Sequence, residues 1–214
     1  MYVPSGSMVH GVSEADRMSE NVSAAVAVRT APQTESLARQ VTWWALLFPA
    51  VMIVALALHS VRLLNWIHVL SGVLWTGADI FMGFILGPVI RRLEPQQRTA
   101  LIAYLVPKTL LYFPAVSLTT GTAGWYLAAW LGLTSPANAQ YAWTVAALVL
   151  ITLMTILGLA IILPNTLRIW FEIQKPEPNR ELIIRLNRNN ILNAAIQGTM
   201  QILIIVVMAH LVMG

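Results

Sequence analysis

Histidine and aspartate are the residues whose placement most suggests chemistry in this chain. When residues 65–90 are placed on a helical wheel, six side chains share about 80° of arc: His68, Gly72, Trp75, Asp79, Met82 and Leu86. Imidazole is a common ligand of haem iron, copper and zinc, and a carboxylate within an apolar helix can carry a proton or a cation. This face is therefore the first candidate for a functional site.

Three of the four histidines are predicted to lie at one membrane face. His59 ends the first apolar run, His68 opens the second and His210 is near the end of the last. Histidines on two helices could be the axial ligands of a b-type haem, and three could hold copper or zinc. The alternative is that they are interfacial end caps, which is the better interpretation of His210, about 140° around its helix from Gln197. Since the chain has no cysteine, thiolate ligands are excluded.

Asp79 is the only acidic residue in the predicted spans. An ionised carboxylate there costs several kcal/mol unless it is paired or hydrated. We expect it to be protonated, to accept hydrogen bonds from hydroxyls of the 108–132 span, or to form a proton or cation route with Gln197. An equally weighted alternative is a buried acid that only locks helices together. Gln197 belongs to an amide stripe with the same spacing: Asn190, Asn193, Gln197 and Gln201.

The elements that position these side chains follow from composition. Hydrophobic residues make up 57% of the 214 and charged residues 10%, against roughly 25% charged in a soluble domain. The sequence predicts an all-α integral membrane protein, with residues 1–40 a disordered cytoplasmic tail and 41–214 a single bundle of five transmembrane helices. The predicted spans are 42–60, 65–90, 108–132, 141–163 and 190–213.

The charge distribution predicts the orientation. Twelve of the thirteen lysines and arginines fall on one side of the five spans, and only Arg62 falls on the other. The positive-inside rule then gives a multi-pass protein of a bacterial inner membrane, N-terminus in and C-terminus out. Short interfacial helices are predicted in the cytoplasmic loops, at 95–107 and within 171–190. The expected partners are the bilayer and either a redox partner or a second copy of the chain. Nucleic acid is not expected as a partner, because the basic residues form no patch interleaved with aromatic residues.

The segment NWIHVLSGVLWTGADIFMGFILGPVIRRL contains the pattern H-x6-W-x-G. It resembles the histidine-containing helix of CopD copper-resistance domains, the membrane domain of certain urate oxidases and HemJ-type protoporphyrinogen oxidases. The later TLLYFPAVSLTTGTAGWYLA is similar to the threonine-glycine helix that follows in several of them. The resemblance covers residues 65–127. It implies haem or porphyrin handling at His68, or movement of copper.

Two functions follow as hypotheses. In the first, His68 and His59 ligate haem b near the outer face, for electron transfer or for haem or copper handling, while Trp75 and Gly72 pack the ring. A copper ion held by His68, His59 and His210 is the variant of this hypothesis. In the second, the protein is a non-enzymatic transporter or permease-like subunit lined by Asp79 and the amide stripe, or an accessory subunit with packing roles only. The sequence leaves the catalytic residues unknown and leaves open whether the protein is an enzyme.

Overall fold

The structure is a computed structural model that describes residues 37–213, which are entirely helical apart from turns. Four helical segments are long and apolar enough to cross a membrane: Val61–Arg92, Pro95–Trp130, Tyr141–Ile173 and Arg180–Leu211. The first predicted span corresponds to a shorter apolar helix, Trp43–Ala57. The all-α fold is confirmed, and four of the five predicted spans correspond to helices long and apolar enough to cross a membrane. Residues 1–36 of the predicted tail lie outside the described residues.

Two of the long helical segments within residues 37–213 each contain a π-helical turn. The first part of the chain forms the helical turn α2 (Leu37–Gln40), the 3-10 turn η1 (Trp43–Leu46) and α3 (Leu47–Ala57). The next segment is α4 (Val61–Ile80), the π turn η2 (Phe81–Leu86) and α5 (Gly87–Arg92), followed by the unbroken α6 (Pro95–Trp130). The remainder is α7 (Tyr141–Leu157), the π turn η3 (Gly158–Ile162), α8 (Leu163–Ile173) and α9 (Arg180–Met213).

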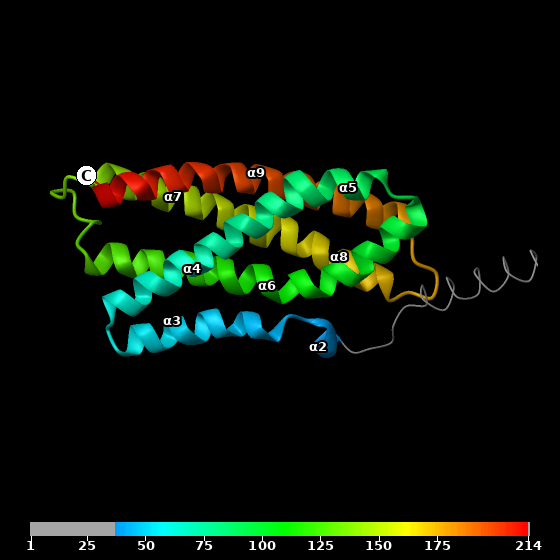
Figure 1. Cartoon of the computed structure of the whole chain (residues 1–214), viewed down its shortest axis with the longest axis horizontal. Coiled ribbons are helices and arrows are strands. Elements are labelled where there is room, and N and C mark those ends of the chain that lie inside the picture. The colour runs from blue at the N-terminus through cyan, green and yellow to red at the C-terminus, as the bar shows by residue number, and fades with distance from the viewer. Residues whose placement is uncertain (1–36, 214) are drawn as a thin grey trace, which may run out of the picture. The chain divides into compact units, whose positions relative to one another are not determined.

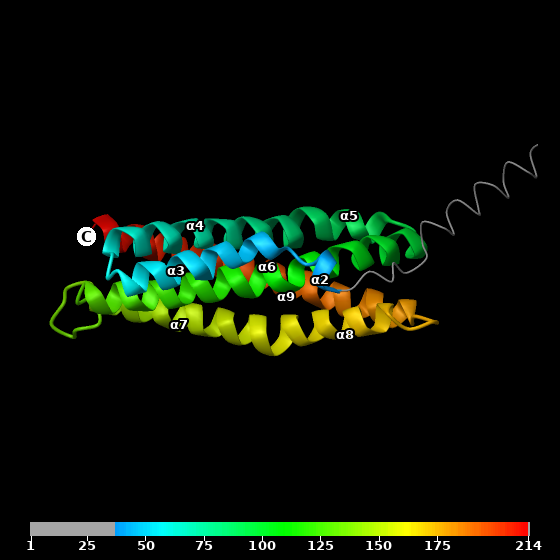
Figure 2. The same cartoon turned by 90° about the horizontal axis from the view of Figure 1, so that it is seen from below.

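The helices of residues 37–213 pack around α6 and α9. Figure 2 shows α4 and α5 on one side, α7 and α8 on the other, and α6 and α9 between them. The closest packing is between α4 and α6, whereas α9 contacts both α4 and the α7–α8 segment. The short helix α3 lies against α4 and α6 (Figure 1). A side chain on α4 can therefore meet one on α9, although the two are distant in sequence.

Two apolar clusters pack the helices together. The first joins α3, α4, α6 and α7, and its buried members include Phe48, Leu64, Trp75, Val116 and Met154. The second joins α6, α8 and α9, and includes Ile102, Val106, Ile169, Ile183 and Leu186. Because lipid tails are as apolar as these side chains, close packing stabilises the bundle more than removal from water does. The polar residues described below lie where these two clusters meet.

The predicted interfacial helices at 95–107 and within 171–190 are wrong as separate elements. Helix α6 runs unbroken from Pro95 through Pro107, and α9 runs unbroken from Arg180. Pro107 removes only one N–H from the hydrogen-bond ladder and is fully buried, so its neighbours hold the helix together. The connection before α9 is instead a tight turn, closed by Glu172, which accepts from Lys175 Nζ at 2.6 Å and from Asn179 N at 3.1 Å.

Candidate functional site

Asp79 lies on α4 with its side chain inside the bundle, and only 2% of the residue is exposed. Gln197 and Gln201, one turn apart on α9, both donate from Nε2 to Asp79 Oδ2, over 2.9 Å and 3.1 Å. Hydrogen bonds to a carboxylate are charge-assisted, so they offset part of the cost of burying it. The site is thus a carboxylate held by two amides of the last helix.

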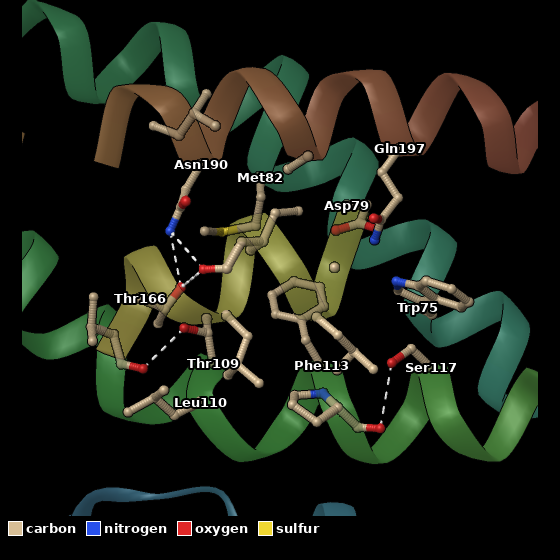
Figure 3. A pocket seen from close by; sticks show the side chains of 18 of the residues that line it. Trp75, Asp79, Met82, Thr109, Leu110, Phe113, Ser117, Thr166, Asn190 and Gln197 are labelled. Atoms are coloured by element: carbon tan, nitrogen blue, oxygen red, sulfur yellow. Dashed lines mark hydrogen bonds between the residues drawn. The ribbon is translucent and has the colours of Figure 1, made fainter. Parts of the chain in front are cut away.

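The same arrangement leaves polar atoms without partners. An ionised carboxylate oxygen can only accept, so each glutamine presents its Nε2 to Asp79 and turns its Oε1 away. The Oε1 atoms of Gln197 and Gln201 are buried and accept no hydrogen bond among the described residues. Trp75 turns the nitrogen edge of its indole toward Asp79 (Figure 3), in a geometry that falls short of a hydrogen bond. The site therefore has hydrogen-bonding capacity that the protein does not use.

A cavity of about 90 Å³ opens beside Asp79, between α6, α9 and the α7–α8 segment. Because one water molecule needs about 10–15 Å³ of such volume, it has room for several waters or a small ligand. Figure 3 shows polar side chains at two ends, with Asp79, Ser117 and Gln197 at one and Thr109, Thr166 and Asn190 at the other; Thr155 and Asn187 also belong to the lining. Figure 3 shows apolar side chains between them, Met82, Leu110 and Phe113 among those labelled.

Asn190 defines the second polar end. Its Nδ2 donates to Thr166 Oγ1 at 2.9 Å and, over a longer 3.4 Å, to the carbonyl of Ile162. Since that carbonyl can only accept, Asn190 must present its amide nitrogen there, which fixes the orientation of the group. Its Oδ1 is buried and has no hydrogen-bond partner among the described residues. Each end of the cavity therefore has a buried carbonyl oxygen without a donor.

Both π turns border this cavity. Met82 comes from η2, and Gly158, Leu159 and Ile162 come from η3. A π turn inserts one residue into a helix, loosens the regular hydrogen-bond ladder and redirects the side chains, and such turns are frequent at functional sites. The carbonyl that ends η3, that of Ile162, is bonded by Thr166 Oγ1 at 2.8 Å as well as by Asn190. Two irregular helical turns thus face one polar cavity.

Glycines set the distance between η2 and α9. A Cβ on Gly83 would lie 2.8 Å from the Cα of Ala195, and one on Gly87 would lie 2.4 Å from Cγ2 of Ile191. The two glycines form a G-x-x-x-G pair, whose lack of side chains lets helix backbones approach closely. The Asp79 carboxylate reaches the amides of α9 because this part of the bundle is so tightly packed.

His68 is turned toward α6. Its Nδ1 lies 2.9 Å from the carbonyl oxygen of Thr120, and the ring lies over Gly124, where a Cβ would be only 2.7 Å from His68 Cε1. Thr120 also lies 2.8 Å from the hydroxyl of Ser71. A Cβ on Gly72 would lie 3.4 Å from Thr120 Cγ2, so α6 fills the notch that was predicted to hold a haem ring. His68 belongs to the α4–α6 contact rather than to the Asp79 cavity.

The other two histidines lie in separate aromatic contacts. His59, in the turn before α4 with a φ of 49°, stacks on Trp130 with ring centroids 5.4 Å apart. His210 packs on Trp143, with centroids 4.0 Å apart. Within residues 37–213 no group of three histidine, aspartate or glutamate side chains is placed to hold a metal ion. The structure therefore does not assemble His59, His68 and His210 into the three-histidine site that their common depth suggested.

The polar stripe on α9 was predicted correctly as an inward-facing surface, and Gln197 is Asp79's partner. The expected hydroxyl partners for Asp79 on α6 are wrong, because Thr120 bonds with Ser71 and not with the carboxylate. Thr166 and the second polar end of the cavity were not predicted from the sequence. Asn190 belonged to the recognised stripe, and its spacing of seven residues from Gln197 was the available signal.

One known family matches part of the chain. Residues 70–175 match the family "Domain of unknown function (DUF4149)". No curated protein matches the chain, and neither does any solved structure. The DUF4149 match begins after His68 and ends before α9, so Trp75, Asp79 and Thr166 lie inside it, whereas Gln197 does not. The match gives no support to the CopD, HemJ or urate oxidase resemblance, and it assigns no cofactor.

The segment that matches DUF4149 supplies most of the cavity wall. It includes η2, α6 and the whole α7–α8 helix, with both π turns. Helix α9, beyond the match, closes the cavity with Asn190 and Gln197. The candidate site is therefore built from the matched segment and completed by the last helix of the chain.

Proposed function

We propose that this integral membrane protein is a non-enzymatic transporter or permease-like subunit that binds a small cationic solute beside Asp79. The observation that carries the proposal is the buried carboxylate of Asp79 at one end of a cavity, next to a glutamine whose Oε1 has no donor. A solute with a positive charge and an N–H group would satisfy both atoms. Ionisable groups inside membrane helices commonly mark the paths of ions and substrates.

The position of the π turns supports the same proposal. Carriers commonly bind their solutes where helices depart from regular geometry, because the loosened turns can change shape at low cost. Here η2 carries Met82 on one wall and η3 carries Gly158 on the opposite wall. Movement at η3 would change the width of the cavity while Gly83, within η2, keeps its contact with α9.

A screen of small cations tests the proposal. The purified chain in lipid nanodiscs is melted with ammonium, guanidinium, ethylamine, choline and putrescine salts at equal ionic strength. We expect at least one to raise the melting temperature of the native chain and to have no effect on Asp79→Asn. Glu172→Gln is the matched control, since Glu172 is also a buried carboxylate but does not line the cavity. Identical shifts in Asp79→Asn, or no shift with any cation, would contradict the proposal.

Haem or metal binding at His68 is the second candidate. It is favoured by one observation: Nδ1 faces a carbonyl oxygen, so it carries the proton and leaves Nε2 of the neutral ring available as a ligand. The filled notch at Gly72 and the stacking of His59 on Trp130 do not suit a haem held between these two histidines. Protein purified from haem-replete cells should show a Soret band that His68→Ala loses; colourless, metal-free protein would eliminate this candidate.

A further inference from the structure

The cavity beside Asp79 is bordered by a loosely packed part of the bundle. Helices α6 and α7 contact each other much less than α6 contacts α4. Of the four candidate spans, the one containing α7 buries the smallest share of its most apolar stretch, 11%. Leu159, which lines the cavity from η3, is itself 40% exposed. The side of the cavity between α6 and η3 therefore faces the lipid in a membrane.

The chemistry of the lining restricts what can bind. Gln197 and Asn190 each have a buried carbonyl oxygen without a donor, and Asp79 contributes a carboxyl group at the Gln197 end, which a cation would hold in its charged form. Gln197 and Asn190 are seven residues apart on α9, which is about 10 Å along the helix axis. The wall between them is apolar, and includes Met82, Leu110 and Phe113. A fitting ligand has a charged donor at one end and an apolar body.

We propose that the cavity takes an amphipathic primary amine from the lipid side, with its ammonium group on Asp79 and its hydrocarbon chain against η3. The proposal rests on the proposed function, and it adds the ligand class and the direction of access. Three N–H donors of an ammonium group can meet the carboxylate and Gln197 Oε1 together. Its chain would lie along Leu159 and Ile162, in the opening between α6 and η3.

Binding of n-octylamine to the full chain in nanodiscs tests this inference. Ethylamine has the same head group without the long chain, and octanol has the chain without the charge; all are compared at equal concentration in the lipid. We expect octylamine to raise the melting temperature of the native chain most. Octanol should shift the melting temperature of the native chain no more than it shifts that of Asp79→Asn. Octylamine affinity should fall at least tenfold in Asp79→Asn, since the ion pair is lost.

Leu159→Asn locates the hydrocarbon chain. Because the chain enters from the lipid, it loses packing contacts rather than shelter from water, and Leu159→Asn should weaken octylamine binding about twofold, whereas ethylamine binding should not change. Leu153→Asn is the matched control, because Leu153 is an exposed leucine of α7 that does not line the cavity. Both substitutions fall on exposed positions, so neither is expected to prevent folding.

The outcomes separate this inference from the proposed function. If octylamine and ethylamine both bind through Asp79 and Leu159→Asn changes neither, the carrier function stands and access from the lipid is refuted. If octylamine and ethylamine both fail to bind while another cation of the screen binds through Asp79, the proposal of a primary amine as the ligand is refuted, and the proposed carrier function stands. If Leu153→Asn weakens octylamine binding as much as Leu159→Asn does, the position assigned to the chain is wrong.

Discussion

The coupling between Asp79 and the α9 amides gives the sharpest stability prediction. Replacing both Gln197 and Gln201 by leucine keeps similar volume but removes both donors to Asp79 Oδ2. Removing the partners of a buried charge costs about 3–5 kcal/mol, because the charge is left uncompensated. An ordinary interhelical hydrogen bond in a membrane is worth only about 0.6 kcal/mol on average. We therefore expect the charge, more than the two hydrogen bonds, to determine the loss.

The same double substitution in an Asp79→Leu background separates the two terms. Because no carboxylate is then left without partners, the double substitution should cost about 1 kcal/mol or less. The difference between the two backgrounds is a coupling energy of about 2–4 kcal/mol. The free energy of unfolding is measured in bicelles by titration with a denaturing detergent. Asn193→Leu, also on α9 and partly buried, is the control and should change both backgrounds by similar small amounts. Equal losses from the double substitution in both backgrounds would refute the coupling.

Three further predictions follow from the packing and the charge distribution. Gly124→Ala should destabilise the bundle by about 1–3 kcal/mol in the same unfolding assay, because its Cβ would meet the ring of His68. Gly77→Ala is the control and should be neutral or stabilising, because a Cβ there meets nothing within 4 Å. Equal effects of the two substitutions would contradict the assigned contact. Gly83→Ala should weaken the η2–α9 contact at least as strongly, because the obstacle is backbone, and unchanged stability would show that the helices separate without cost. A reporter fused after Gly214 should be active outside the cytoplasm if the positive-inside rule sets the orientation, and cytoplasmic activity would overturn it.

The fold was predictable because apolar runs of helical length have few alternatives in a membrane. The boundaries between the helices were less predictable. Pro107 suggested a boundary, yet the helix continues, since a single missing N–H is tolerated where neighbouring helices pack closely. The π turns at Phe81–Leu86 and Gly158–Ile162 left no readable signal, because one inserted residue shifts the phase of the face that follows and the apolar composition hides that shift.

The candidate site was predicted in part, because polar residues within apolar helices stand out in the sequence. Asp79 and Gln197 could be paired because each is a polar group on an apolar helix and needs a partner there. The depth of a histidine also follows from its position along a span, but its direction depends on the rotation of the helix. His68 is therefore found against Thr120 of α6, while His59 lies in the turn before α4 and stacks on Trp130.

Native mass spectrometry of the protein released from its own membranes tests the central claim most directly. If the cavity beside Asp79 binds a small cationic solute, the native chain should carry a small-molecule adduct that is absent from Asp79→Asn and retained in Glu172→Gln. Equal adducts on Asp79→Asn and on the native chain would contradict the account. So would a native chain that carries no adduct and that none of the cations of the screen binds.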